Sequence, residues 1–204
     1  MKALQLIFRY IKYLFRAKSK HDAQAPFLYE LITEVINKRT SDNSCEKIET
    51  LRKELCKQER TIKITDFGAG STINNSKTRK VKDVAKNSAK NAKFGKLLYR
   101  IIQFYKPKNI LELGTSLGIS TSYLAKADAN AQVFTFEGCH ETAAIAQENF
   151  DKQRIKNTSI TLGDFNLTLT KKLKEIKTID LAFIDGNHKE KPTITYFEKC
   201  LEYT

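Results

Sequence analysis

The sequence lacks any C-x-x-C pair, any long apolar run, and any internal repeat or low-complexity tract. Its four cysteines are far apart in the chain: Cys45, Cys56, Cys139 and Cys200. This spacing excludes a zinc knuckle and gives no disulfide framework, so we expect reduced thiols and a cytoplasmic protein. Because no run of about 18 apolar residues occurs, no transmembrane segment is expected either. Hydrophobic residues still make up 41% of the 204 residues, which predicts a packed core rather than a disordered chain.

Acidic residues are in the minority, since the chain has 36 Lys and Arg against 23 Asp and Glu, a net charge of +13. Such an excess is typical of proteins that bind nucleic acid or anionic membranes. Most of the basic residues are lysines, whereas proteins that recognise phosphates and bases rely on arginine forks. We therefore favour a solvated, lysine-rich surface, and a nucleic-acid partner such as RNA is the alternative.

Residues 3–17 have the pattern of an amphipathic helix. Their apolar side chains recur at helical spacing and form one stripe: Leu4, Ile7, Phe8, Ile11, Leu14 and Phe15. Basic residues interrupt the stretch at Arg9, Lys12 and Arg16, which excludes the unbroken apolar segment of a secretory signal. We expect this helix to pack on its own domain, and a basic helix that lies on an anionic membrane surface is the alternative.

The chain divides into three predicted parts. Residues 1–60 form an N-terminal helical extension that caps the rest, with helices at 3–17, 26–38 and 45–59. Residues 61–94 hold a strand, a turn and a basic linker. In residues 95–204, short apolar runs alternate with amphipathic stretches, which predicts strands at 109–113, 132–136, 159–162 and 179–184 with helices between them. This alternation indicates an α/β fold, with a parallel sheet, helices on both faces and a ligand site at the carboxyl ends of the strands.

A glycine turn follows the first of these strands. The apolar run at 110–113 contains Glu112 and leads into Gly114 and Gly118, and an amphipathic helix begins at once. Such a turn brings backbone N–H groups and a helix N-terminus close to a ligand. Dinucleotide sites have the pattern G-x-G-x-x-G, whose middle glycine makes room for a pyrophosphate, but here Ser116 stands at that position. The turn therefore favours a cofactor without a pyrophosphate and argues against a nicotinamide dehydrogenase.

Acidic side chains follow the other predicted strands. Glu137 ends the second strand, where an acid can accept both hydroxyls of a ribose. Both NAD and S-adenosylmethionine contain that ribose, so Glu137 does not distinguish between them. The glycine turn does, and it favours S-adenosylmethionine. Asp164 follows the third strand and Asp185 the fourth. Because the carboxyl ends of parallel strands meet at one edge of a sheet, we expect these acids to line one crevice.

Two motifs together resemble the class I S-adenosylmethionine-dependent methyltransferases, in particular their O-methyltransferase-like branch. They are ILELGTSLGIST at residues 110–121 and FIDGNH at residues 183–188. The resemblance covers residues 95–204 and implies a Rossmann-like sheet and the transfer of a methyl group from S-adenosylmethionine. It implies O-methylation of a small-molecule acceptor, and leaves open a homodimer.

The resemblance also implies roles for residues at the matching positions. The glycine turn would wrap the methionine part of the cofactor with these residues: Glu112, Gly114, Thr115, Ser116 and Gly118. Glu137 and Gly138 would bind the ribose, Asp164 would face the adenine amino group, and Phe165 would stack beside the adenine. Asp185 would lie near the transferred methyl group as a catalytic residue, and related enzymes hold a divalent cation such as Mg²⁺ at this position. His188 would act as a general base or help Asp185 hold the metal.

The chain departs from this family in one respect. The full fold has seven strands, and we predict four before the sequence stops at Thr204. The predicted sheet is therefore incomplete at the C-terminus, where the family has further metal ligands and much of the acceptor pocket. A non-catalytic cofactor-binding or interaction protein is for this reason a second alternative.

Overall fold

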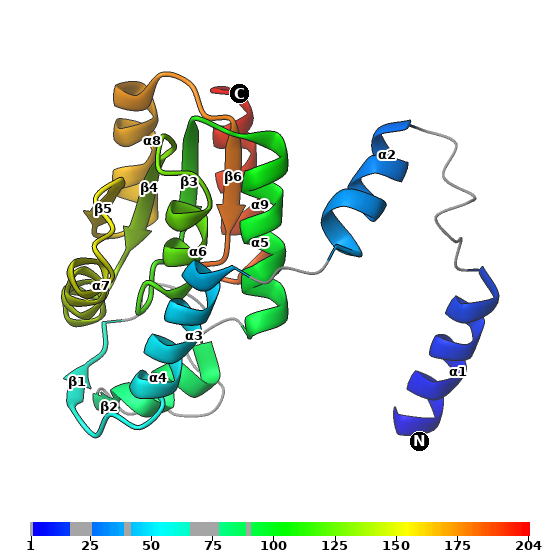
Figure 1. The fold of residues 1–204 in the computed structure, drawn as a ribbon, viewed down its shortest axis with the longest axis horizontal. Helices are drawn as coiled ribbons and strands as arrows, with labels where there is room; N and C mark the ends of the chain where they lie inside the picture. Colours follow the sequence, from blue (N-terminus) through cyan, green and yellow to red (C-terminus); the bar gives the residue numbers. More distant parts are fainter. Residues whose placement is uncertain (1, 17–25, 39–41, 66–77, 89–90) are drawn as a thin grey trace. The chain divides into compact units, whose positions relative to one another are not determined.

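The computed structural model describes residues 2–16, 26–38, 42–65, 78–88 and 91–204 (Figure 1). The chain forms two units, Met1–Arg39 and Thr40–Thr204. The first contains the helices α1 (Lys2–Arg16) and α2 (Pro26–Glu30), and α2 continues as a π-helical stretch η2 (Leu31–Ile36). The two helices predicted in this region are confirmed, and the second ends in a π-helix. Within the described residues, no helix is both long and apolar enough to cross a bilayer.

A four-stranded parallel sheet lies at the centre of the second unit. Its strands are β3 (Asn109–Leu113), β4 (Gln132–Glu137), β5 (Thr158–Leu162) and β6 (Leu181–Ile184). Their order in the sheet is β5-β4-β3-β6, so the chain moves outward from β3 and then returns to the other side of that strand. The order therefore reverses between β3 and β6, which is where open parallel sheets bind ligands. The predicted α/β fold is confirmed.

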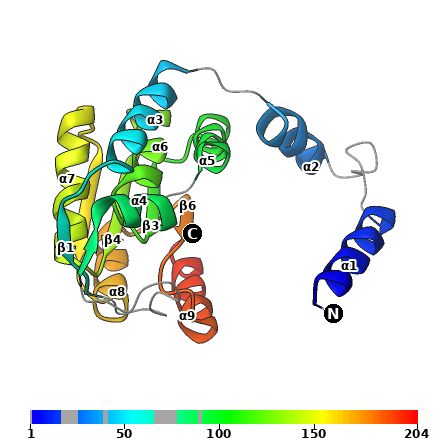
Figure 2. The same cartoon turned by 90° about the horizontal axis from the view of Figure 1, so that it is seen from below.

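Helices cover both faces of this sheet (Figure 2). Three of them pack on one face: α5 (Ala92–Tyr105), α6 (Ile119–Ala127) and α7 (His140–Gln153). Two pack on the other: α8 (Phe165–Ile176) and α9 (Glu190–Leu201). Successive side chains of a strand point to opposite faces, so Ile110 joins the first core and Leu111 the second. Both side chains are fully buried, which is why β3 is apolar from Ile110 to Leu113 except at Glu112.

Residues 42–65 and 78–88 add a further layer over α5, α6 and α7. This layer contains the helices α3 (Asn43–Leu55) and α4 (Val81–Ser88) and an antiparallel pair of short strands, β1 (Thr61–Lys63) and β2 (Thr78–Lys80). Polar contacts attach α3 to the helices beneath it. The hydroxyl of Tyr99 donates to Asp42 over 2.8 Å, and that of Tyr123 donates to Glu49 over 2.7 Å. The boundaries that we predict at residues 60 and 94 stay predictions.

Helices α5 and α6 approach each other closely at Gly95. A Cβ atom on Gly95 would lie 2.3 Å from Cε2 of Tyr123. The Tyr123 ring is fully buried, and its hydroxyl is held by Glu49, so it has little freedom to move. Glycine in the middle of a helix costs about 0.5–1 kcal/mol relative to alanine, so the close packing of the two helices explains its presence here.

The central strand also buries a carboxylate. Glu112 is inaccessible to solvent, and its Oε2 accepts hydrogen bonds from the hydroxyls of Thr121 (2.5 Å) and Thr135 (2.7 Å). Burial raises the pKa of Glu112 to about 7 and nearby Asp185 contributes to the rise, although the hydroxyls of Ser120 and both threonines oppose it. The carboxyl group thus joins β3 to α6 and β4 just before the glycine turn.

We expect Gly95→Ala to destabilise the protein. The new methyl group would overlap the Tyr123 ring, and overpacking of this kind costs about 1–3 kcal/mol, whereas the gain in helix propensity is smaller. The free energy of unfolding, measured by urea denaturation, should fall by about 1–2 kcal/mol. Lys93→Ala, on the exposed side of the same helix, is the control and should change it little. Equal stability of the Gly95→Ala variant and the wild type would contradict this packing.

The raised pKa of Glu112 also predicts how stability varies with pH. An unperturbed glutamate has a pKa of 4.5, so between this value and about 7 the unfolded state loses the proton that the folded state keeps. Stability should therefore fall as the pH rises through this window. Glu112→Gln cannot ionise and should not lose this stability, so relative to wild type it should gain about 1–3 kcal/mol between pH 5 and 8. The surface variant Glu175→Gln is the control. If the free energies of unfolding of wild type and Glu112→Gln varied with pH in parallel, Glu112 would have the same pKa in the folded and unfolded states, which would contradict this prediction.

Candidate functional site

The turn between β3 and α6 has an unusual backbone. Gly114 and Gly118 have φ angles of +107° and +78°, and Ser116 has a φ of +49°. A Cβ atom on Gly114 would lie 2.7 Å from the backbone oxygen of Asp185, so the ends of β3 and β6 touch there. On Gly118, it would meet the ring of Phe150. Both glycines are therefore required by the way the turn packs on its own protein.

The end of β4 holds this turn. The N–H groups of Gly114 and Thr115 both donate to the oxygen of Phe136 over 3.0 Å. Next along the chain, the N–H of Ser116 donates to Oε2 of Glu137 over 2.7 Å. The glycine turn and the carboxylate that the sequence places at one site are therefore in direct contact.

Glu137 has room for a further ligand. Its Oε1 accepts the N–H of Cys139 over 2.9 Å, so each carboxylate oxygen takes one backbone donor. An ionised carboxylate has about four acceptor positions, which leaves about two for the hydroxyls of a ribose. Glu137 and Gly138 are also only partly buried. The residues thus fit the predicted ribose contact, and the contact itself stays a prediction.

Asp164 and Phe165 lie at the start of α8, after β5. Oδ1 of Asp164 accepts the N–H of Asn166 over 2.8 Å and caps the helix. The ring of Phe165 packs edge to face on Phe136 and Tyr196, with centroid distances of 6.3 and 5.9 Å. This ring therefore already has two aromatic neighbours, and stacking on an adenine stays a prediction.

Asp185 directly follows β6, at the point where the strand order reverses. Its N–H donates to the oxygen of Leu113 over 2.8 Å, and the residue is partly buried, whereas His188 is exposed. Among the described residues, no group of three or more His, Cys, Asp or Glu side chains is arranged to hold a metal ion. These residues alone do not form the predicted metal site, so we assign no step to a cation.

Two predicted cofactor ligands face the protein interior. Glu112 is bonded to threonine hydroxyls as described above, and the hydroxyl of Thr115 lies 2.6 Å from that of Thr135. Both side chains are buried, so they support the turn from below. Their predicted contact with the cofactor stays a prediction.

The sequence did not identify two asparagines that shape the site. The amide of Asn149 on α7 donates to the oxygen of Leu117 over 2.9 Å and holds the glycine turn from the other side. Asn187, with a φ of +58°, donates to the hydroxyl of Tyr196 over 3.0 Å and fixes the loop after β6. Asparagine after glycine in a loop is a signal for the left-handed conformation of Asn187. The contact of Asn149 joins positions 32 residues apart, which a single sequence does not reveal.

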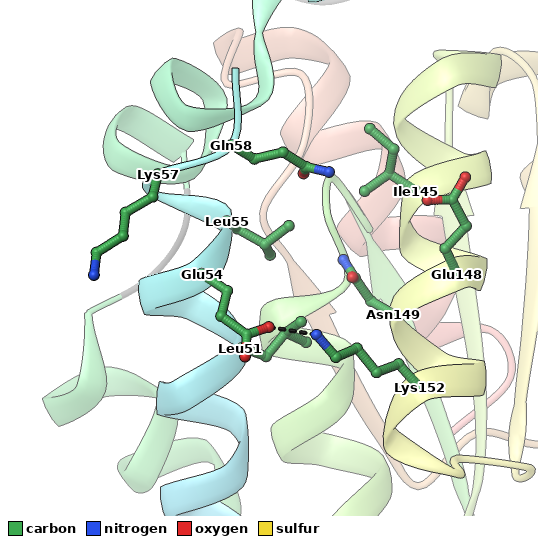
Figure 3. A pocket seen from close by; sticks show the side chains of 9 residues that line it. All are labelled: Leu51, Glu54, Leu55, Lys57, Gln58, Ile145, Glu148, Asn149 and Lys152. Carbon is green, nitrogen blue, oxygen red and sulfur yellow. Dashed lines mark hydrogen bonds and ion pairs between the residues drawn. The ribbon is translucent and has the colours of Figure 1, made fainter. Parts of the chain in front are cut away.

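A separate hollow of about 500 Å³ lies between α3 and α7 (Figure 3). Its floor is apolar, with Leu51, Leu55 and Ile145, and an ion pair between Glu54 and Lys152 crosses its rim. Its lining includes Asn149, which supports the glycine turn, but none of the predicted site residues. We therefore place the candidate site at the strand ends and not in this hollow.

The candidate site is acidic although the chain is basic. The partly buried carboxylates of Glu137, Asp164 and Asp185 follow three strands at the same edge of the sheet. Carboxylates that are partly removed from water favour a cationic ligand and repel phosphates. The electrostatics of this edge thus suit a ligand with positive charge.

Comparison with known proteins gives a consistent result. Residues 111–204 match the family model described as "Methyltransferase domain". A catechol O-methyltransferase of Niastella koreensis is 36% identical over 111 residues, which are 52% of this chain and 49% of that protein. This chain therefore spans about half the length of that relative.

Solved structures have the same fold. An SAH-bound methyltransferase of Podospora anserina matches with a TM-score of 0.58 and 18% identity, over 82% of this chain and 59% of the other. An O-methyltransferase of Bacillus cereus in complex with SAH matches with a TM-score of 0.56 and 20% identity, over 86% and 66%. Residues 111–204 are therefore similar in sequence to a methyltransferase domain, and the chain shares its fold with these two methyltransferases.

Proposed function

We propose that this chain binds S-adenosylmethionine at the acidic edge of its sheet and acts in the O-methylation of a small molecule. The hydrogen bond from the N–H of Ser116 to Glu137 is the observation that carries the proposal, because it joins the glycine turn to the predicted ribose ligand. Relatives support the same function: structural neighbours contain SAH, and one relative with a similar sequence is a catechol O-methyltransferase.

The chain's own residues would position and desolvate the cofactor. When bound, S-adenosylmethionine supplies an electrophilic methyl group on a positively charged sulfur. Glu137 would accept the ribose hydroxyls with the acceptor positions that the backbone leaves open. Asp164 would accept the adenine amino group, and Asp185, at the junction of β3 and β6, would lie nearest the positive charge. Holding the reacting groups in line is the main contribution that a protein makes to such a displacement.

The acceptor hydroxyl must lose its proton. Asp185 is the carboxylate that we assign to this step, and His188, in the same loop, is the second candidate base. A divalent cation held by Asp185 would need ligands beyond those that the described residues bring together. Catechol is the first acceptor to test, because it is the substrate that the name of the Niastella koreensis relative gives.

We also propose a cytoplasmic location, which the four free cysteines support. A small molecule suits the acidic edge better than a nucleic acid, whose phosphates the three carboxylates would repel. A homodimer stays a prediction without a structural argument of its own.

Replacing Glu137 should weaken cofactor binding. Hydrogen bonds to charged groups contribute about 1.5–3 kcal/mol each, so Glu137→Ala should raise the Kd for S-adenosylhomocysteine at least tenfold in calorimetric titration. Glu175→Ala, on the surface of α8, is the matched control and should bind like wild type. Thermal unfolding of both variants separates lost binding from lost folding. Equal affinity of Glu137→Ala and wild type would remove the assignment of the ribose site.

Asp185→Asn separates catalysis from cofactor binding. The amide keeps the shape of the side chain but is a poor base, so the rate of methyl transfer to catechol should fall about 100-fold or more. The Kd for S-adenosylhomocysteine should change by less than about tenfold, because Glu137 and the glycine turn are intact. A variant with the wild-type rate would exclude Asp185 as the base. Absence of transfer by the wild-type chain would contradict the enzymatic part of the proposal and leave cofactor binding to stand on its own test.

A further inference from the structure

Helix α1 separates its charges from its apolar residues. The segment Lys2–Arg16 contains four basic residues and no acidic one. At about 100° per residue, positions 2, 5, 9, 12 and 16 fall within a sector about 80° wide. All four basic residues and the helix's single glutamine occupy these positions, and every other position holds an apolar or aromatic residue or alanine. The helix therefore has a narrow basic side and a broad apolar side.

The apolar side is exposed in the first unit. Eight large side chains of α1 are accessible: Leu4, Leu6, Ile7, Phe8, Tyr10, Ile11, Tyr13 and Phe15. Phe8 is 70% exposed and Phe15 is 88% exposed, so the described residues of this unit do not cover them. An apolar surface of this size on a single helix is typical of a segment that binds a partner.

A tyrosine lies at the border between the basic and apolar sides of α1, and this position is typical of a helix that binds a lipid surface. Tyr10 and Tyr13 stack on each other with ring centroids 6.3 Å apart, and Tyr13 is next to the basic sector at helical spacing. Tyrosine prefers the boundary between the headgroups and the acyl chains of a bilayer. A helix of 15 residues is about 22 Å long, whereas the hydrocarbon layer is about 30 Å thick, so α1 is too short to span it.

We propose that α1 lies in the plane of a membrane and binds anionic phospholipids. Its apolar side enters the boundary of the acyl chains, while Arg9 and Lys12 stay at the level of the headgroups. The charge decides between lipid and other partners. A second copy of α1 would bring the same positive charge and repel it, whereas an anionic bilayer attracts each basic residue and also accepts the apolar side. Because this helix is in the first unit, the inference does not depend on the proposed function of the second.

Co-sedimentation of the full chain with vesicles tests this proposal. The vesicles contain phosphatidylcholine alone or with about one third phosphatidylserine, which gives the surface a negative potential. We expect at least tenfold stronger binding to the phosphatidylserine vesicles, and loss of this advantage at about 1 M salt, where the Debye length is about 3 Å. Thermal unfolding of every variant shows that the second unit is intact.

Three double variants show which part of the chain binds. Arg9→Glu with Lys12→Glu should weaken binding at least tenfold, because both charges at the headgroup level are reversed. Phe8→Ser with Ile11→Ser should weaken it by a similar factor although the charge is unchanged. Lys86→Glu with Lys93→Glu is the control, with the same change of net charge at exposed positions of the second unit, and should bind like wild type.

Three results would overturn the proposal. An equal loss in the Lys86/Lys93 control would show that only the net charge of the chain attracts lipid. Equal binding to both kinds of vesicle would exclude the role of the basic side. If the chain bound neither kind of vesicle, α1 would pack on its own protein or on a second copy. Sedimentation velocity distinguishes these two cases, because the chain is a monomer in the first and self-associates in the second.

Discussion

The hydrogen bond between the N–H of Ser116 and the carboxylate of Glu137 is the contact on which the site depends. It fixes the glycine turn after β3 against the end of β4, and the two N–H groups before it are held by the oxygen of Phe136. Below the turn, the buried carboxyl group of Glu112 joins the same strands to α6. The turn is thus attached at several points, and a ligand that meets it finds its donors and acceptors already in place.

Close packing explains why this attachment needs glycine. At Gly114, the backbone passes so close to Asp185 that no side chain fits, and this contact brings the acid that follows β6 beside the turn. At Gly118, the ring of Phe150 fills the space that a side chain would need. The strand order reverses at the same place, so the topology of the sheet and the packing of the turn together create one acidic edge.

Much of this fold could be predicted from the sequence, because strands and helices of an α/β domain have different apolar periods. The strand at 109–113 has the predicted bounds, and the other three strands of the sheet differ by one or two residues at their ends. Strand β2 was missed, since three polar residues become a strand only by pairing with β1. The support of the turn by Asn149 and the two aromatic neighbours of Phe165 were missed for the same reason: distant parts of the chain make these contacts.

The two units differ in charge as well as in structure. Acids gather at the edge of the sheet, whereas every charged residue of α1 in the first unit is basic. The excess of 13 positive charges therefore says little about the ligand of the site, because local arrangement and not net charge decides what each surface attracts. A lysine-rich chain is in this way compatible with a cationic cofactor.

In the proposed complex, the cofactor contacts the glycine turn and the end of β4. An NMR titration of the full chain with S-adenosylhomocysteine, following the backbone amide signals, tests it most directly. We expect the largest shifts at Ser116, Gly118 and Gly138, with little change at Leu51 and Leu55 in the hollow between α3 and α7. Shifts confined to that hollow, or no shifts at a saturating concentration, would contradict it.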